Sequence, residues 1–255
     1  MFLLGIILSS VCLALVGCGT DSATGDKGEG GDKKYVVATD ATYAPMEYMD
    51  DKGNIVGTDI DILNALAEEL DIELEFKNYG WEPLFTAVSN EEVDFAVSSI
   101  TITEERKETY DFSDPYYTAN QLILVPEDSS VAKFDDLKDK RVSVQINTTG
   151  HEVVKGLLGN TSSKIVATES MPLAISEMLN GNADAAIGDN AVINDYKKNN
   201  PKVALKTVED ETFEKEYYGI MVKKGNTELL TLLNDGIAKL KENGKLKEIT
   251  GFDVK

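Results

Sequence analysis

The chain has 255 residues, of which 42% are hydrophobic and 27% are charged, and this balance is typical of a globular protein with one large domain or two small lobes. Its formal net charge is -20, which argues against nucleic acid as a partner, because phosphate binding needs a basic surface.

The first residues differ from the rest of the chain. Residues 2–16 are almost wholly apolar and uncharged, and this run is too short for a comfortable membrane span. Small residues then precede Cys18, a pattern that predicts a lipoprotein signal peptide at 1–17, with Cys18 carrying lipid (palmitate) after cleavage. The alternative is a buried apolar helix with a free Cys18. Residues 18–34 are rich in Gly, Ser, Thr, Asp and Lys and predict a flexible tether. We therefore expect an extracytoplasmic protein, anchored to the cell membrane by lipid on Cys18.

Strands and helices alternate after this segment. Strands are expected at 35–39, 72–76 and 93–97, with a hairpin at 48–55 that turns at 51–54. A helix capped by Thr58 or Asp59 follows the hairpin, and Trp81 opens another helix with Pro83 in its first turn. This order predicts βαβ units and a parallel sheet.

The alternation breaks near 116–120 and again near 216–219. Between the breaks, strands are expected at 121–125, 141–145, 165–167, 183–187 and 203–208, and helices at 152–158, 172–179 and 190–197. After the second break, an apolar stretch at 217–222 precedes a long helix that Asn226 caps and Gly244 ends. Two similar series predict two lobes with a cleft between them.

Polar loops follow the predicted strands at 40–45, 98–106, 145–150 and 188–190. Ligands of open α/β sheets lie at the carboxyl ends of the strands, so these loops predict the site. The stretch from Ser98 to Arg106 holds several hydroxyls and one guanidinium, a combination that suits a carboxylate.

Seven ordered motifs carry a family resemblance. They are TDATYAPMEY at 39–48, GTDIDI at 57–62, SSITITEER at 98–106, DFSDPYY at 111–117, VQINTTG at 144–150, DAAI at 184–187 and YYGI at 217–220. Together they resemble the extracellular solute-binding proteins of polar amino acid ABC transporters, family 3. The chain departs from the usual pattern at Asn147, where a glycine is often found, and at Thr58-Asp59, where Phe-Asp is usual.

The resemblance implies a two-lobed α/β fold of the periplasmic-binding-protein type (type II), with two hinge strands and a ligand cleft that closes by hinge bending. Residues 35–117 and 218–255 would form lobe 1, and residues 118–217 lobe 2. It also implies a monomer without cofactor or metal that delivers a polar L-amino acid to an ABC permease in the cytoplasmic membrane.

The implied ligand-binding residues are Asp40, Tyr43, Trp81, Ser98, Ser99, Thr101, Arg106, Gln145, Thr148, Thr149 and Asp189. Arg106 would bind the α-carboxylate, helped by Thr101 and by backbone N–H groups near Ser99. The helix N-terminus at 148–150 would favour the same anion. Asp189 would take the α-ammonium, although on its own it is equally a helix cap. An amino acid is a zwitterion, so its site needs one fixed cation and one fixed anion, each costly to bury unless paired.

The side-chain pocket would be walled by Tyr43 and Trp81, which on their own are more typical of a core. Asp40 would reach a cationic or amide side chain, and Gln145 stands where some relatives carry a lysine. With aromatic walls suited to cation–π contact, these residues favour arginine or lysine, with histidine possible. Glutamine and cystine remain open.

Enzyme signatures are absent from the sequence, which has no GxSxG, phosphate-binding GxxxxGK or HExxH motif. Its single histidine, His151, is expected to be a solvated helix residue. We therefore expect a binding protein and no catalysis. The alternatives on the same fold are a cyclohexadienyl-dehydratase-like enzyme that acts on a prephenate-like substrate, and a ligand-binding adhesin or receptor partner.

Overall fold

The computed structural model describes residues 33–254. The predicted signal peptide, Cys18 and nearly all of the predicted tether lie outside the described residues. The last tether residue, Lys34, already belongs to the first strand, because it pairs with Glu73 in a parallel ladder. Among the helices of residues 33–254, none has the length and apolar character needed to cross a bilayer.

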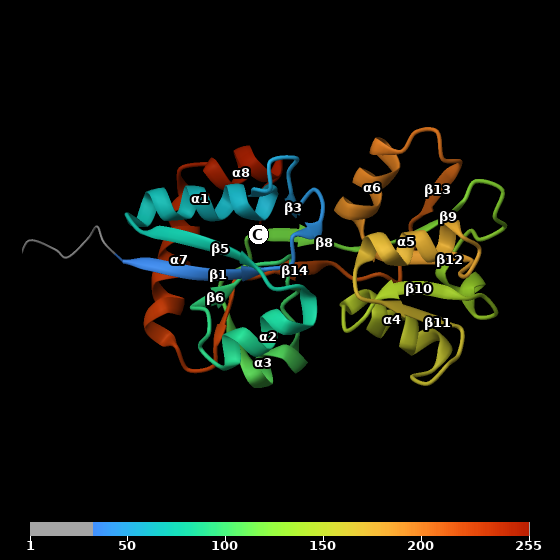
Figure 1. Cartoon of the computed structure of the whole chain (residues 1–255), viewed down its shortest axis with the longest axis horizontal. Helices are drawn as coiled ribbons and strands as arrows, with labels where there is room; N and C mark the ends of the chain where they lie inside the picture. The colour runs from blue at the N-terminus through green and yellow to red at the C-terminus, as the bar shows by residue number, and fades with distance from the viewer. Residues whose placement is uncertain (1–32, 255) are drawn as a thin grey trace, which may run out of the picture.

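The described chain forms two α/β lobes that lie side by side (Figure 1). The first lobe is built on a sheet with strand order β5-β1-β6-β15-β7. These strands are β5 (Glu73–Asn78), β1 (Lys34–Thr39), β6 (Phe95–Ala96), β15 (Met221–Lys223) and β7 (Tyr110–Phe112). Its helices are α1 (Thr58–Leu70), α2 (Trp81–Ser89), α3 (Glu104–Thr109), α7 (Thr227–Glu242) and α8 (Lys245–Thr250).

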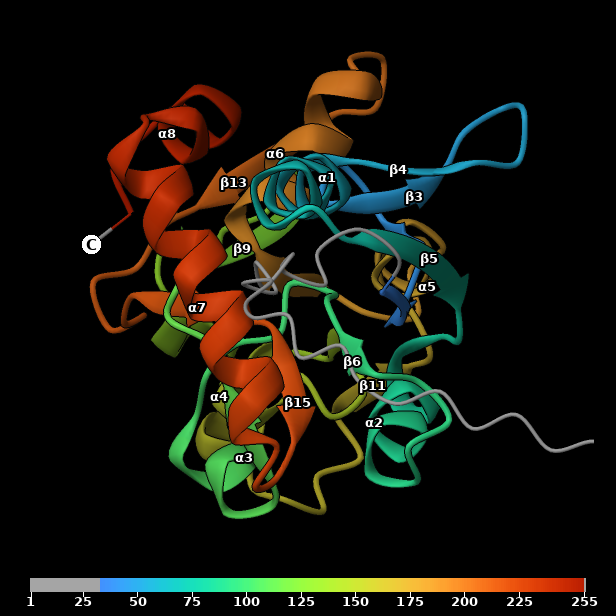
Figure 2. The same cartoon turned by 90° about the vertical axis from the view of Figure 1, so that its left-hand side faces the viewer.

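Helices cover both faces of this first sheet. In Figure 1, α1 and α8 lie on one side of it and α2 and α3 on the other. Figure 2 shows α7 running beside β15. Helix α7 meets α1 closely at Gly236, where an added Cβ would lie 2.8 Å from Leu66 and 2.9 Å from Leu70. The C-terminal helices therefore complete the lobe that β1 begins.

The second lobe has the strand order β11-β10-β12-β9-β13. Its strands are β11 (Ile165–Thr168), β10 (Val142–Gln145), β12 (Ala185–Asp189), β9 (Gln121–Pro126) and β13 (Leu205–Val208). Its helices are α4 (Thr149–Leu158), α5 (Met171–Leu179) and α6 (Asn190–Asn199), with a short 3₁₀ helix at Phe134–Leu137.

The predicted parallel pairing of β1 with β5 and β6 is confirmed, and both sheets also contain antiparallel strands. Strands β10, β11 and β12 run parallel, but β9 pairs antiparallel with both β12 and β13. In the first lobe, β15 pairs antiparallel with β6 and β7. The reason is topological, since β9 and β15 follow the crossings between the lobes and so enter their sheets from the cleft edge.

Two short antiparallel strands join the lobes. They are β8 (Tyr117–Ala119) and β14 (Glu216–Tyr218), which form a separate two-stranded sheet. They coincide with the two breaks in the strand–helix alternation. The remaining strands, β2 (Thr42–Tyr43), β3 (Glu47–Met49) and β4 (Ile55–Val56), form the small sheet that includes the predicted hairpin.

Helix α1 begins differently from the prediction. Its N-cap is Gly57, with no side-chain cap, and neither Thr58 nor Asp59 fills that position. The backbone leaves no alternative to glycine, since φ is 131° and an added Cβ would lie 2.2 Å from the carbonyl oxygen of Met46. Asp59 is instead fully buried. The cap by Asn226 on α7 is confirmed, because its side chain accepts from the N–H of Leu229 at 3.3 Å.

Candidate functional site

A pocket between the lobes encloses about 320 Å³ of space not filled by protein atoms, part of it open to solvent. The structure brings together in it every residue of the predicted ligand-binding set, together with Glu47. The lining residues are Asp40, Tyr43, Glu47, Trp81, Ser98, Ser99, Thr101, Arg106, Gln145, Thr148, Thr149 and Asp189. They lie at or after the ends of β1, β5, β6, β10 and β12, which point to the cleft from both lobes.

Arg106 lies in the first turn of α3 with its guanidinium against aromatic rings. The guanidinium carbon is 5.3 Å from the centre of the Trp81 ring and 5.6 Å from that of Phe85. One end donates to the carbonyl of Thr101 at 2.8 Å, and the other donates to the carbonyl of Asn147, in the second lobe, at 3.3 Å. Burial lowers the pKa of Arg106, but arginine stays a cation in proteins. The side chain is therefore a cation held in place on the pocket wall.

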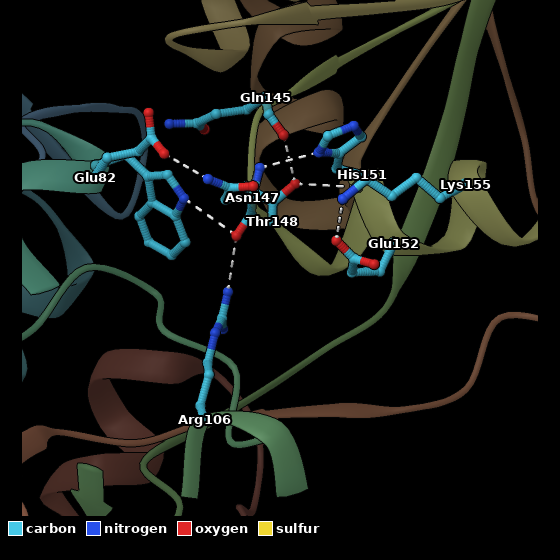
Figure 3. A network of polar contacts seen from close by, with 9 residues as sticks. Glu82, Arg106, Gln145, Asn147, Thr148, His151, Glu152 and Lys155 are labelled. Atoms are coloured by element: carbon cyan, nitrogen blue, oxygen red, sulfur yellow. Dashed lines mark hydrogen bonds and ion pairs between the residues drawn. The ribbon is translucent and has the colours of Figure 1, made fainter. Parts of the chain in front are cut away.

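Asn147 of the second lobe contacts several groups of the first lobe across the cleft (Figure 3). Its carbonyl oxygen accepts from the indole N–H of Trp81 at 3.3 Å as well as from Arg106. Its side-chain amide donates to the carboxylate of Glu82. Three groups of the first lobe thus contact one residue of the second, so the lobes are closed on each other.

The turn before α4 is fixed by Thr148 and His151 (Figure 3). The hydroxyl of Thr148 caps α4 by accepting from the N–H of His151 at 3.2 Å, and it donates to the carbonyl of Gln145 at 2.8 Å. Nδ1 of His151 accepts from the N–H of Asn147 at 3.1 Å. His151 is only 7% exposed, which corrects the expectation of a solvated residue. Its pKa is lowered by burial and by the charge of Lys155, so the ring stays a neutral acceptor.

Asp189 ends β12 and stands at the N-cap position of α6, but its side chain makes no cap hydrogen bond. Instead, its carboxyl accepts from the hydroxyl of Tyr218 and, at 2.6 Å, from the amide of Gln121. The pKa of Asp189 is raised to about 7, mainly by burial and to a smaller extent by the negative charge of Glu216. The helix-cap alternative is thus wrong for this side chain, which faces the pocket.

Asp40 also lines the pocket. Its carboxyl accepts from the hydroxyl of Thr42 at 2.9 Å and, across the cleft, from the amide of Gln145 at 3.2 Å. Burial raises the pKa of Asp40, while these two hydrogen bonds lower it. Tyr43 and Trp81 are 9% and 8% exposed and also line the pocket, so they are both core and wall.

Glu47 and Asp59 form a buried pair of carboxyls that accept hydrogen bonds from Ser98, Ser99 and Tyr116 of the first lobe. Ser98 donates to Glu47 at 2.8 Å, while the N–H of Ser99 and the hydroxyl of Tyr116 donate to Asp59 at 2.7 and 2.9 Å. Burial and the charge of Asp59 raise the pKa of Glu47 well above its usual range. Burial also raises the pKa of Asp59 to about 6.

The sequence reasoning missed three groups beside the pocket, namely Glu47, Glu216 and Gln121. Glu216 accepts from the hydroxyl of Thr101 at 2.6 Å, from that of Thr149 at 2.7 Å, and from the amide of Gln121 at 2.9 Å. The sequence offered one signal for Glu216, namely its position at the second break in the strand–helix alternation, where a strand crosses from one lobe to the other beside the cleft.

The pocket offers a ligand one fixed cation and two carboxyls besides the buried Glu47, whose raised pKa favours its neutral form. The pocket lining holds one guanidinium, at Arg106, and the carboxyls of Asp40, Glu47 and Asp189. Within residues 33–254 there is no group of three or more His, Cys, Asp or Glu side chains placed to hold a metal ion.

Comparisons with known proteins agree with this geometry. The sequence model of the family described as bacterial extracellular solute-binding proteins, family 3, matches residues 35–251. The chain is 41% identical to the probable histidine-binding protein of Neisseria gonorrhoeae over 246 residues, which are 95% of this chain and 91% of that protein. It is 46% identical to the arginine-, lysine-, histidine-binding protein ArtJ of Geobacillus stearothermophilus, whose crystal structure matches with a TM-score of 0.83 over 88% of this chain and 97% of that one.

A further solved structure belongs to the ancestral amino acid-binding protein AncCDT-1, described as a precursor of cyclohexadienyl dehydratase. It is 35% identical, with a TM-score of 0.76 over 85% of this chain and 93% of that one. The fold and the family match together lead to one conclusion: the chain belongs to the bacterial extracellular solute-binding proteins of family 3.

Proposed function

We propose that the chain is the substrate-binding component of an ABC importer for a basic L-amino acid, with arginine, lysine and histidine as the candidates. One observation carries the proposal. A single pocket holds Arg106 at one place and two separate carboxyls, Asp189 and Asp40, at others. In this proposal Arg106 binds the α-carboxylate, Asp189 the α-ammonium, and Asp40 the cationic end of the side chain.

The charge of the pocket supports a basic ligand over a neutral one. A glutamine or cystine side chain would leave Asp40 without a cationic partner, and an unpaired buried charge is costly. The rings of Tyr43 and Trp81 suit a flat or cationic side chain. The relatives described above as histidine-binding and as arginine-, lysine-, histidine-binding proteins point to the same ligand class.

Binding would proceed by closure of the lobes about the hinge. For this purpose we assign residues 35–117 and 218–255 to lobe 1 and residues 118–217 to lobe 2. The hinge strands β8 and β14 straddle both boundaries and pair with each other, which supports this division. The ligand would be sequestered between Arg106 and Asp189 and released to the permease on opening.

The proposed location is outside the cytoplasmic membrane, as a monomer attached by lipid on Cys18. The apolar run at 2–16 and the small residues before Cys18 support this. The change Cys18→Ala should move the protein from the membrane fraction to the soluble extracytoplasmic fraction. Persistence in the membrane fraction would contradict the anchor.

The test of function is calorimetry of the purified protein with arginine, lysine, histidine, glutamine, glutamate and cystine, beside Arg106→Ala. We expect micromolar or tighter binding of a basic amino acid, which is roughly 8 kcal/mol or more of binding free energy. Arg106→Ala should abolish it. Binding of glutamine or cystine alone would retain the site but refute the basic ligand.

The enzyme alternative has one supporting observation, the likeness to a dehydratase precursor. We propose binding without turnover, since the curated relative and the ArtJ structure are both described as binding proteins. Incubation with a prephenate-like substrate separates the two, because consumption of that substrate would establish catalysis.

A further inference from the structure

Glu216 is the one carboxylate of the hinge strand β14, and three donors meet on it. The hydroxyl of Thr101 comes from the first lobe at 2.6 Å, and the hydroxyl of Thr149 comes from the second lobe at 2.7 Å. Both reach the same oxygen, Oε2. The other oxygen, Oε1, accepts from the amide of Gln121 at 2.9 Å. The carboxylate therefore links both lobes to the hinge.

These contacts decide which way the hydrogen of each threonine hydroxyl points. A hydroxyl has one hydrogen to donate and two lone pairs that accept. Since Thr101 and Thr149 both give their hydrogen to Glu216, only lone pairs remain for the pocket that they line. A lone pair attracts an N–H donor and repels a carboxylate. The two hydroxyl oxygens are thus prepared for an ammonium.

Gln121 extends the same arrangement to Asp189. Its amide nitrogen lies 2.6 Å from Oδ1 of Asp189 and 2.9 Å from Oε1 of Glu216, so its two hydrogens serve mainly the two carboxyls. A longer contact of 3.3 Å joins the same nitrogen to the hydroxyl oxygen of Thr149, which accepts there as well. The orientation of this amide is determined, because turning it round would place its oxygen against both carboxyls. Asp189 and the two hydroxyl oxygens then form one group of acceptors.

We propose that Glu216 is a positioning residue that makes Thr101 and Thr149 hydrogen-bond acceptors and so selects for the α-ammonium of the ligand. This rests on the proposed binding of an amino acid. Glu216 acts through the two threonines and needs no contact with the ligand. The anionic end of the ligand is then left to Arg106 and to backbone N–H groups.

The test is Glu216→Gln in the whole protein. The substitution keeps the shape but cannot keep the contacts, because a side-chain amide has one oxygen and one NH₂ group. If its oxygen faces the threonines, its NH₂ meets the NH₂ of Gln121. If the NH₂ faces the threonines, their hydrogens turn into the pocket. Glu214→Gln, an exposed position two residues earlier, is the matched control.

Arginine, lysine and histidine are each compared by calorimetry with the analogue that lacks the α-amino group. We expect Glu216→Gln to weaken binding of the amino acid by at least about tenfold, the value of a lost hydrogen bond to a charged group. Binding of the desamino analogue should change little, and Glu214→Gln should resemble the wild type. A purely structural role would weaken both ligands equally, and that result would overturn the proposal, as would an unchanged affinity.

Two further variants keep the test decisive if Glu216→Gln does not fold, as judged by circular dichroism. Thr101→Val and Thr149→Val remove the hydroxyls at constant shape and should reproduce the selective loss of amino acid binding. An unselective loss in both would overturn the inference. If the wild type binds no amino acid, both the proposed function and this inference fail. If the wild type binds normally but the variants weaken the amino acid and its desamino analogue equally, only this inference is overturned.

Discussion

The Asp189 carboxyl has a pKa of about 7 because it is buried beside the negative charge of Glu216. The other titratable or charged groups that interact with it are Tyr43, Tyr117, Tyr218 and Arg106. An arriving α-ammonium favours the ionised carboxyl, so the pKa of Asp189 falls on binding. We therefore expect the affinity for the amino acid to decrease as the pH falls below that value.

Proton release should accompany this binding. At a pH near 6, Asp189 is largely protonated without ligand and ionised with it, so up to about one proton leaves per ligand bound. Calorimetry in two buffers with different ionisation enthalpies measures this number directly. Identical apparent enthalpies in the two buffers would show that Asp189 does not change its protonation and would contradict the prediction.

The buried pair Glu47 and Asp59 makes a separate prediction for stability. The pKa of both carboxyls is raised in the folded state, so the folded protein binds more protons than the unfolded chain above the ordinary pKa values. Stability then falls as the pH rises through that interval. Glu47→Gln removes one of the two charges but can still accept from Ser98. It should stabilise the protein by on the order of 1–3 kcal/mol at a pH near 8 and change little at a pH near 4.

Urea unfolding of the wild type and Glu47→Gln at both pH values measures this effect. Glu73→Gln, on the exposed side of β5, is the control and should leave the pH dependence as it is. Equal stability of Glu47→Gln and wild type at the higher pH would mean that the pair is not under electrostatic strain.

Residue by residue, the sequence located the pocket lining but not its support. Arg106 and Asp189 follow strand ends, which converge at the cleft, and the family resemblance singled out these two residues among the polar groups there. Glu47, Glu216 and Gln121 could not be found in this way. A carboxyl is buried only where donors from distant segments meet it, as Thr101 and Thr149 meet Glu216, and a single sequence does not show such encounters.

At the scale of elements, periodicity predicted most strands and helices, and the family resemblance is confirmed together with the two-lobed fold. The prediction missed or misplaced the features that geometry between elements decides. Strand direction in β9 and β15 depends on the hinge crossings, and helix α8 (Lys245–Thr250) is too short to show a period. The start of α1 depends on how closely Gly57 approaches Met46.

This close approach makes Gly57 sensitive to a single methyl group. Gly57→Ala would bring a Cβ within 2.2 Å of the Met46 carbonyl oxygen, at a φ of 131° that side chains disfavour. We expect a loss of at least about 2 kcal/mol in the free energy of unfolding. Thermal and urea unfolding measure it.

Gly156→Ala is the matched control within the second lobe. Gly156 lies inside α4, and an added Cβ would meet nothing within 4 Å. Alanine is the better helix former, so this change should stabilise by about 0.5–1 kcal/mol. Similar effects of the two substitutions would show that backbone conformation does not distinguish the sites.

For the whole molecule, the balance between open and closed lobes decides how tightly a ligand is held. Three of the contacts that cross the cleft converge on Asn147, through its carbonyl to Trp81 and Arg106 and through its side chain to Glu82. Contacts present only in the closed state favour that state and slow ligand release. The side chain of Asn147 can be tested separately from its backbone.

Asn147 has a φ of 56°, which suits glycine, so Asn147→Gly removes the side chain and leaves the backbone carbonyl in place. We expect this change and Glu82→Ala each to weaken amino acid binding by about two- to fivefold, the usual value of one exposed polar pair, mainly through faster release. Because both substitutions disrupt the same contact, the double variant should lose no more than either single one. Stopped-flow release rates and calorimetry of all four proteins complete the cycle. Asn147→Ala removes the same side chain and also strains the backbone, so it should be the weakest binder of the series. Additive effects in the double variant would show that the Asn147–Glu82 contact does not hold the lobes together.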